Sequence, residues 1–494
     1  MITSQRGRQQ VLFNSRIYSM RASEAKEISH SRTLSWRCTT SKCYAFMKTD
    51  ADLSLRRIIE LNGVHAHFCK EKSASSQQKR KIYPAIKRKA VEDPSDAPEK
   101  VVTKHLLRME DKDQLGSKDI NNLKHSVFRE RASEVPYRLP KKTDDVFEQV
   151  EDQRDKEHFK TGTSSKNQWY LYPFALFGMI FMTCATNLLQ LCDDAVEHVL
   201  VDGTFGYCPK HFAQLYTIHI YRAGHYIPVA HIALTGKSEP QYYMMWTLLE
   251  YLCYFVCGKT LKIKSLLVDF ELGAINAIYR KFPGITITGC RFHLSQAWFR
   301  WIQQHKGYDY LTPYLDDKSP TGQYLRSFFG LSFLPPDEVA DAFTMLYGLK
   351  PDPSISDAFT DYLLENYIGE SAQFPPQLWA RMVTDHRDVR TTNGPEAFHK
   401  NYNSLFPSKH PNIYKVIYVL LLIQEKTFTA FTDIRNQLVR PQAAPQLKKD
   451  ENVRKVWYKY LASSRSDEDL RKFLYTLGNR YRGKKVGKVP AAAV

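Results

Sequence analysis

Hydrophobic residues are most regularly patterned between about residue 198 and residue 304. Three apolar runs there have the length of buried strands: His198–Phe205, Gln214–Tyr221 and Tyr226–Thr235. Only a short turn at Ala223-Gly224 separates the last two, and so brief a connection indicates that they pair as antiparallel neighbours. We therefore expect an antiparallel sheet at the start of this region.

Helices and strands alternate after these three runs. Apolar residues recur at helical spacing over Glu239–Val256, and patterns of strand, helix, strand and helix follow at Ser265–Asp269, Gly273–Phe282, Ile285–Gly289 and His293–Gln304. Three strands followed by helix, strand, helix, strand and helix is the order of a ribonuclease H-like α/β core. The sequence thus predicts a mixed sheet of that fold class for the main domain.

The flanks of this core have different patterns. Trp169–Ala185 is apolar enough for one long buried strand, and residues 306–385 show helical patterns without strand alternation. We expect residues 306–385 to form an all-helical insertion, after which Glu396–Asn403 resumes the core as its closing helix. The predicted main domain spans residues 136–430, and a helical, basic C-terminal tail follows over residues 431–494.

The first 70 residues form a separate unit. Short strand-like segments around Tyr18, Trp36 and Phe46 alternate with polar turns, which predicts a small β-rich module over residues 1–70. Residues 71–135 are charged, low in apolar content and interrupted by prolines. Because such a composition buries little apolar surface, we expect a basic, flexible linker that is partly helical.

Two basic triplets lie in the expected linker, Lys79-Arg80-Lys81 and Lys87-Arg88-Lys89. Two such clusters on either side of a short spacer are typical of a bipartite nuclear import signal. The triplets therefore predict a nuclear protein, with a solvated run of charges as the alternative.

Charge and composition narrow the possible partners. The chain has 494 residues, with 70 Lys and Arg against 52 Asp and Glu and a formal charge of +18, which favours binding to DNA or RNA. The longest apolar stretch, Tyr172–Ala185, is shorter than the roughly 20 residues that cross a bilayer, so no membrane partner is expected. Nine cysteines are too few for a disulfide scaffold in a chain of this length, which indicates a reducing compartment.

Two acidic residues end apolar strands of the predicted core. Asp202 and Asp269 each follow a buried run, and α/β folds place ligand-binding groups at such strand ends. Glu396, at the start of the closing helix, is the natural third carboxylate. Carboxylates from separate elements can hold the paired Mg²⁺ ions of phosphoryl transfer. A turn or helix cap is the alternative role for each acid taken singly.

Four blocks around these acids resemble the MULE (Mutator-like element) transposase domain. They are Val201–Phe205 with Gln214–His219, Val268–Glu271 with Ala274–Ala277, Gly289–Gln296, and Thr392–His399 with Asn403–Phe406, in the family's order. The resemblance implies a DDE-type catalytic triad of Asp202, Asp269 and Glu396. It also implies Mg²⁺ or Mn²⁺ dependence, cleavage and transfer of double-stranded DNA at element ends and target, and a homo-oligomer on DNA. Gly394-Pro395 departs from the family's commoner Asn-x-Val before the glutamate.

The third block contains a Cys-x-x-His motif formed by Cys290 and His293. The two residues could supply soft metal ligands, but a zinc site needs four ligands, or three and a water, and no second pair lies nearby in the sequence. His293 could instead contact DNA phosphate or brace the acidic site. A purely structural Cys290 inside the core is a further alternative.

A zinc site is expected in the N-terminal module. Cys38 and Cys43 form Cys-x4-Cys, and His65 and His67 form His-x-His about twenty residues later, a set that suits tetrahedral Zn²⁺. Cys69 could compete as a ligand. Metal binding would supply folding energy to a unit too small for a large core. With Phe13, Tyr18 and Trp36, the arrangement resembles the FLYWCH zinc finger, a DNA- or protein-binding module.

Three functions remain open at this point. The first is a DNA transposase of the Mutator-like class. The second is a domesticated, transposase-derived DNA-binding or transcription regulatory protein without catalysis. The third is a nuclease of the same fold with another substrate. The three differ in whether the acidic residues hold metal and cut DNA.

Overall fold

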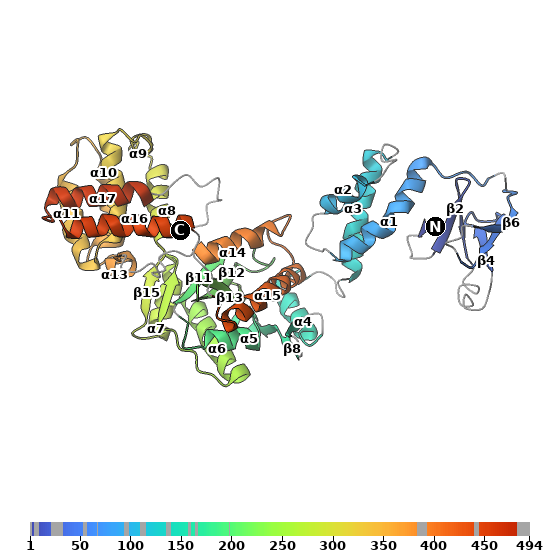
Figure 1. Ribbon diagram of the computed structural model, residues 1–494, viewed down its shortest axis with the longest axis horizontal. Helices are drawn as coiled ribbons and strands as arrows, with labels where there is room; N and C mark the ends of the chain where they lie inside the picture. Colours follow the sequence, from blue (N-terminus) through green and yellow to red (C-terminus); the bar gives the residue numbers. More distant parts are fainter. Residues whose placement is uncertain are drawn as a thin grey trace. The chain divides into compact units, whose positions relative to one another are not determined.

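A computed structural model describes most of the chain and divides it into two compact units (Figure 1). It describes residues 2–3, 9–20, 33–52, 57–66, 68–92, 98–108, 115–134, 140–156, 160–163, 166–196, 198–382, 393–438 and 444–481. Unit 1 comprises Met1–Arg138 with Leu405–Pro407, and unit 2 comprises Leu139–Ser404 with Ser408–Val494. Each unit is described by itself below.

Unit 1 begins with an antiparallel sheet of six strands in sequence order. The strands are β1 (Ile2–Thr3), β2 (Gln9–Phe13), β3 (Arg16–Ser19), β4 (Thr33–Cys38), β5 (Phe46–Asp50) and β6 (Ile58–Asn62). Tyr18, Leu34, Trp36 and Met47 alternate along β3, β4 and β5 and form a small core on one face. The Trp36 indole N–H donates to the Thr49 hydroxyl at 2.9 Å. The expected β-rich module is therefore confirmed.

Three helices follow where we expected a flexible linker. They are α1 (Ala74–Glu92), α2 (Pro98–Leu106) and α3 (Ser117–Glu134). Ile82, Ile86 and Ala90 recur four residues apart on α1 and form an apolar stripe, which packs against buried residues of α2 and α3. The expectation of a segment without a core was wrong, because the charged residues between these positions hide the stripe in the average composition.

The basic triplets consequently lie on a helix. Both are part of α1, where Lys79 pairs with Asp119 at 2.6 Å and Lys87 with Glu130 at 2.5 Å. These ion pairs join α1 to α3. A role of the triplets in nuclear import stays a prediction, on a helix rather than on the expected flexible chain.

Unit 2 is built on a seven-stranded mixed sheet. Its strands are β9 (Leu171–Phe174), β10 (Met179–Met182), β11 (His198–Thr204), β12 (Gln214–Arg222), β13 (His225–Leu234), β14 (Ser265–Val268) and β15 (Thr286–Gly289). They lie in the order β15-β14-β11-β12-β13-β10-β9. Pairing is antiparallel from β11 through β9 and parallel across β11, β14 and β15. The five strands from β11 to β15 agree with the sequence-based expectation to within about one residue at each end.

The single strand expected over Trp169–Ala185 was wrong. The segment forms a hairpin of β9 and β10, preceded by a second hairpin of β7 (Lys160–Thr163) and β8 (Lys166–Trp169). Gly178 reverses the chain with a φ of 64°, a left-handed conformation that favours glycine. Any Cβ at this position would collide with the Thr235 hydroxyl.

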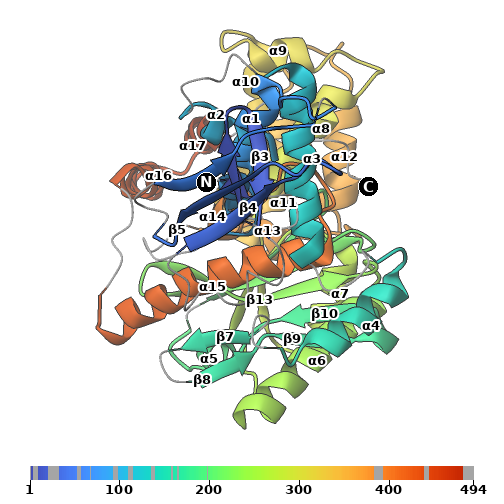
Figure 2. The same ribbon diagram turned by 90° about the vertical axis from the view of Figure 1, so that its right-hand side faces the viewer.

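Helices flank the mixed sheet. They are α4 (Thr143–Gln153), α5 (Ala185–Leu191), α6 (Glu239–Cys257), α7 (Leu272–Lys281), α8 (Arg291–Gln304), α14 (Asn393–Ser404) and α15 (Ile413–Arg435). Figure 2 shows α15 running along the sheet beside β13. The Asn187 and Gln424 side-chain amides exchange two hydrogen bonds at 2.9 and 2.8 Å and join α5 to α15. No helix among the described residues is both long enough and apolar enough to span a bilayer.

A helical layer extends unit 2 beyond the sheet. It contains α9 (Leu311–Leu315), α10 (Pro320–Phe328), α11 (Val339–Gly348), α12 (Ala358–Leu363) and α13 (Pro376–Trp379), as expected for the insertion. The expected C-terminal tail belongs to the same layer, since α17 (Asp467–Tyr481) lies beside α10 and α11, and α16 (Ala444–Leu461) lies beside α17 (Figure 1). Trp457, Phe473, Leu474 and Leu477 join the main core. The C-terminal helices are thus a part of the fold rather than an appendage.

Two glycines allow α17 to approach its neighbours closely. A Cβ at Gly478 would collide with the Arg326 carbonyl oxygen, and one at Gly330 with the Leu474 carbonyl. Arg326 itself is fully buried and donates to the carbonyls of Tyr314 and Asp316 at 2.6 and 3.0 Å. The backbones approach closely here because a glycine without a Cβ forms one side of each contact.

We therefore expect Gly478→Ala to destabilise unit 2 by about 1–3 kcal/mol, because the added methyl group forces α17 away from α10. Gly348→Ala is the control, since no described atom lies within 4 Å of a Cβ there. Urea unfolding of the full chain measures both. Equal midpoints for the two variants would contradict the close packing of α17.

Candidate catalytic and metal sites

Asp202 and Asp269 lie on neighbouring strands of the mixed sheet. Asp202 is in β11, and Asp269 directly follows β14, the parallel neighbour of β11. Val199 pairs with Leu266 and Leu200 with Leu267, and the same sequence offset separates Asp202 from Asp269. Because neighbouring strands lie about 4.8 Å apart, the register brings the two carboxylates to one edge of the sheet.

The helix α14 brings Glu396 to this edge. Phe398 packs against two buried imidazoles, stacked on His231 at 5.3 Å and edge-on to His219 at 5.0 Å between ring centroids. Burial lowers the pKa of both imidazoles, that of His231 to about 3, so Phe398 packs against two rings without charge. The helix contacts β11, β12 and β13, and Pro395 lies in its first turn, where proline is tolerated.

His399 connects α14 directly to Asp202. Its Nδ1 lies 3.0 Å from Asp202 Oδ2, and its Nε2 lies 3.1 Å from the Thr217 hydroxyl oxygen on β12. Thr217 in turn donates to the Asp202 carbonyl oxygen at 3.1 Å. Glu396 precedes His399 by three residues, so the two side chains share one face of the helix. Among the described residues, however, the ligand atoms grouped with Glu396 within 4.8 Å are those of Cys290 and His293, not those of Asp202 or Asp269.

The two aspartates have opposite electrostatic surroundings. Burial acts to raise the pKa of Asp202, but the imidazoles of His399 and His293 and the Gly203 amide outweigh it, and the pKa lies below its ordinary value. Burial raises the pKa of Asp269 to about 7, and repulsion from Asp202 adds to the shift. Without a cation, Asp202 therefore keeps its negative charge to a lower pH than Asp269 does.

Asp269 has the property expected of a metal ligand. Its Oδ1 is buried and has no hydrogen-bond partner among the residues that the structure describes. An ionised oxygen in such a place is costly unless a cation faces it. Asp202 keeps free lone pairs as well, because each carboxylate oxygen accepts more than one bond. The residues present therefore fit a divalent cation with oxygen ligands.

Cys290 and His293 lie beside the third acid. Ligand atoms of Cys290, His293 and Glu396 all fall within 4.8 Å of one another. Cys290 follows β15 and is buried, and His293 lies in the first turn of α8. Burial acts to lower the pKa of His293, but Cys290 and the two aspartates outweigh it and raise the pKa. A charged His293 would brace the acidic site electrostatically, one of the roles considered from the sequence.

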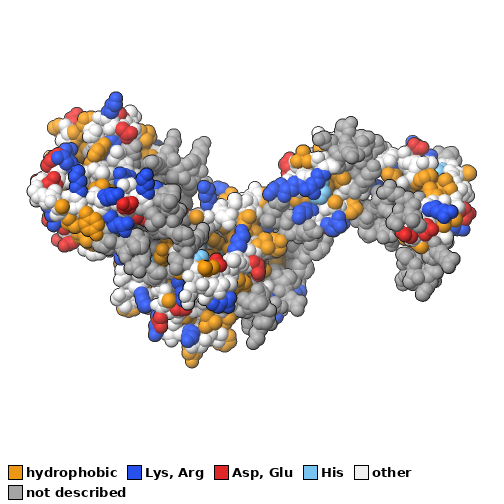
Figure 3. All heavy atoms as spheres, in the orientation of Figure 1, with side chains coloured by type: hydrophobic (Ala, Val, Ile, Leu, Met, Phe, Trp, Pro, Cys, Tyr) orange, Lys and Arg blue, Asp and Glu red, His pale blue; other side chains and the backbone are white. Residues whose placement is uncertain are grey.

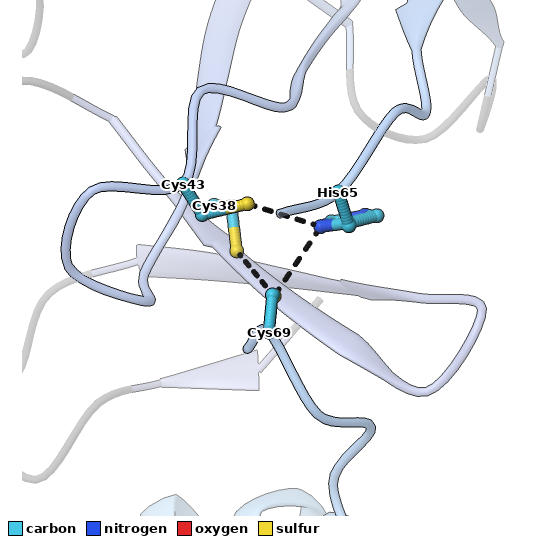
Figure 4. A group of neighbouring side chains, drawn as sticks. All are labelled: Cys38, Cys43, His65 and Cys69. Atoms are coloured by element: carbon cyan, nitrogen blue, oxygen red, sulfur yellow. Dashed lines mark hydrogen bonds between the residues drawn. The ribbon is translucent and has the colours of Figure 1, made fainter. Parts of the chain in front are cut away.

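A second cluster lies in the N-terminal module. Ligand atoms of Cys38, Cys43, His65 and Cys69 lie within 4.8 Å of one another, and Figure 4 shows the four side chains converging. Cys43 Sγ lies 3.3 Å from His65 Nδ1, and Cys38 Sγ lies 3.5 Å from Cys69 Sγ. Two thiols and an imidazole of the predicted set thus come together. His67, the fourth predicted ligand, lies outside the described residues.

The sequence reasoning missed some of the residues at these sites. His399 was recognised as part of a motif but was given no role, although its spacing from Glu396 was a usable signal. Thr217 lies in the first of the four blocks but was also given no role, because a polar side chain at that position looks like an ordinary strand residue. Cys69 was recognised as a competitor, and the structure places it within the cluster.

Zinc content tests the N-terminal cluster. We expect the purified chain to contain zinc and Cys43→Ala to lose it, because a closed structural site needs four ligands. Mass-spectrometric metal analysis after dialysis against a weak chelator measures this. Cys192→Ala removes a half-buried thiol from unit 2 and should leave the zinc content unchanged. Full zinc in Cys43→Ala would show that the cluster is not the site.

Two family models match the chain, and each covers part of one site. Residues 198–297 match the MULE transposase domain, a range that includes Asp202, Asp269 and the Cys-x-x-His motif and ends before Glu396. Residues 1–67 match the FLYWCH zinc finger domain, a range that ends before Cys69. No curated protein matches the chain. The resemblances noted in the sequence are thus confirmed: the chain carries an N-terminal FLYWCH zinc finger domain, followed in the sequence by a MULE transposase domain.

Proposed function

We propose that this chain is a DDE-type DNA transposase of the Mutator-like class, which cleaves and transfers DNA strands with Mg²⁺ or Mn²⁺. The observation that carries the proposal is the pair Asp202 and Asp269 at one edge of the mixed sheet, where Oδ1 of Asp269 is buried and has no hydrogen-bond partner among the described residues. An acid held in this way has little structural use, since it destabilises the fold unless a cation faces it.

The order of the strands supports a ribonuclease H-like core. The first three core strands, β11, β12 and β13, pair antiparallel, and β14 and β15 are added in parallel on the other side of β11. The first strand is therefore central and carries the first acid. Its parallel neighbour carries the second, and the closing helix carries the third.

Different residues at this edge of the sheet would have different roles. Asp202, Asp269 and Glu396 would hold the metal ions, which activate the attacking water or hydroxyl and stabilise the leaving oxygen. His399 keeps Asp202 ionised and oriented, since it lies at hydrogen-bond distance from Oδ2. His293 adds positive charge where the phosphate oxygens of a DNA strand would approach.

Double-stranded DNA is the proposed substrate. The charge of +18 provides attraction without sequence preference, and Figure 3 shows Lys and Arg side chains gathered over the helices of unit 1. Lys100, Lys104 and Arg108 are exposed there, on and after α2. The zinc finger is the candidate for reading the element ends. Action on chromosomal DNA requires a nuclear location and favours a homo-oligomer that holds two ends together.

Asp269→Asn separates catalysis from DNA binding. The substitution keeps the side chain's size and removes its charge, so metal positioning fails and nicking should fall by several orders of magnitude. Folding should survive, because loss of a buried charge near other acids is neutral or stabilising without metal. Asp341→Asn removes the same charge from an exposed position on α11 and is the matched control. Nicking of supercoiled plasmid with Mg²⁺ or Mn²⁺, beside gel-shift titrations at several salt concentrations, measures both.

The outcomes distinguish the three functions. Nicking by the wild type and Asp341→Asn, with none by Asp269→Asn and equal DNA affinity in all three, supports the transposase. A wild type that binds DNA and never cuts it would favour a domesticated regulator. Cutting of DNA without joining to a target would favour a nuclease. Equal cutting by Asp269→Asn and the wild type would remove Asp269 from the site.

A further inference from the structure

We propose that Cys69 completes the zinc site of the N-terminal module in place of His67, so that three thiolates and one imidazole bind the metal. The proposed ligands are Cys38 Sγ, Cys43 Sγ, Cys69 Sγ and His65 Nδ1. The inference concerns unit 1 alone and does not depend on catalysis by unit 2. It departs from the Cys-x4-Cys and His-x-His pattern that the sequence suggests, and Cys69 lies beyond the residues that match the FLYWCH domain.

The distances fit a single tetrahedral ion. With zinc about 2.3 Å from sulfur and about 2.0 Å from nitrogen, tetrahedral ligands lie roughly 3.8 Å apart for two sulfurs and roughly 3.5 Å for sulfur and nitrogen. Cys69 Sγ lies 3.5 Å from Cys38 Sγ and 3.4 Å from His65 Nδ1, and Cys43 Sγ lies 3.3 Å from the same nitrogen. All four ligand atoms fall within 4.8 Å (Figure 4). The four side chains would therefore need to move little to bind a zinc ion between them.

The backbone holds Cys69 in this place. The Cys69 N–H donates to the Ala66 carbonyl at 2.8 Å, and the turn brings Cys69 back beside His65. Farther along, the Lys72 N–H donates to the Ser15 carbonyl at 2.7 Å and fastens the chain to the turn between β2 and β3. Cys69 is buried and also donates its thiol to the Thr40 hydroxyl at 3.3 Å. Thr40 belongs to the loop between Cys38 and Cys43, so Cys69 contacts both halves of the site.

His65 is oriented to bind through Nδ1. Its Nε2 lies 2.9 Å from the hydroxyl of the buried Tyr18. A ligating imidazole commonly donates its other N–H to an oxygen, which fixes both the tautomer and the ring orientation. Here Nε2–H would donate to Tyr18, and the lone pair of Nδ1 would face the three thiols. Both imidazole nitrogens would then have partners. Cys38, Cys43 and His65 would supply three ligands, and Cys69 would supply the fourth.

A buried structural cysteine is the simpler alternative, since free cysteine is among the residues most often buried. That role explains burial but not the approach of one thiol to another thiol and to an imidazole nitrogen, both within 3.5 Å. Three thiolates also give the site a net charge of about −1 instead of zero and favour soft ions such as Cd²⁺. Ligand identity can therefore be read from spectroscopy.

Cobalt substitution of the full chain tests the proposal. Co²⁺ bound to thiolates has a near-ultraviolet charge-transfer band whose intensity rises with each thiolate. Cys69→Ser should lower this band by about a third, and should weaken zinc binding by more than the roughly 10- to 100-fold that loss of an outer-shell partner costs. His67→Ala is the matched control and should leave the band and the zinc affinity unchanged.

Two further results decide the case. Cys69→His restores a ligand but not a thiolate, so it should recover zinc affinity while keeping the weaker band, which separates loss of a ligand from misfolding. Loss of zinc by His67→Ala would overturn the proposal, whatever Cys69→Ser does, because the proposed site does not need His67. An unchanged band in Cys69→Ser would overturn it as well.

Discussion

The parallel pairing of β11 with β14 is the interaction on which the candidate active site depends. Its register sets Asp202 beside Asp269 at the edge of a buried sheet, where each ionised carboxylate lacks full hydration. The fold compensates the first acid with His399 and the Gly203 amide and leaves one oxygen of the second without a partner among the described residues. This asymmetry is the reason that a divalent cation fits here, since it supplies the charge that the protein does not.

The rest of unit 2 keeps the third acid in place. Glu396 is far from the two aspartates in sequence, and α14 reaches the sheet because Phe398 packs against His219 and His231. The helical layer that precedes α14 is itself closed by α17, which approaches α10 at Gly478. Helices from the end of the chain thus support the layer inserted before the closing helix, so the site depends on packing far from its carboxylates.

Periodicity predicted the core strands well, because buried strands and amphipathic helices have patterns that local sequence displays. The strand borders around Asp202 and Asp269 are one example. The hairpin at Gly178 was missed because a continuous apolar run hides a turn, and the core of α1–α3 was missed because Ile82 and Ile86 are surrounded by charges. Contacts between distant segments, such as Asn187 with Gln424, have no local pattern at all. They follow from the fold, which the sequence does not display directly.

The central claim is that Asp202, Asp269 and Glu396 bind divalent metal. The most direct measurement is a crystal structure of the full chain grown with Mn²⁺, in which anomalous scattering locates the ion independently of the protein atoms. The account predicts Mn²⁺ bound by oxygens of Asp202 and Asp269 at about 2.1–2.2 Å, with Glu396 beside it. Saturating Mn²⁺ with no anomalous peak at these carboxylates, or a peak only at exposed acids elsewhere, would contradict it.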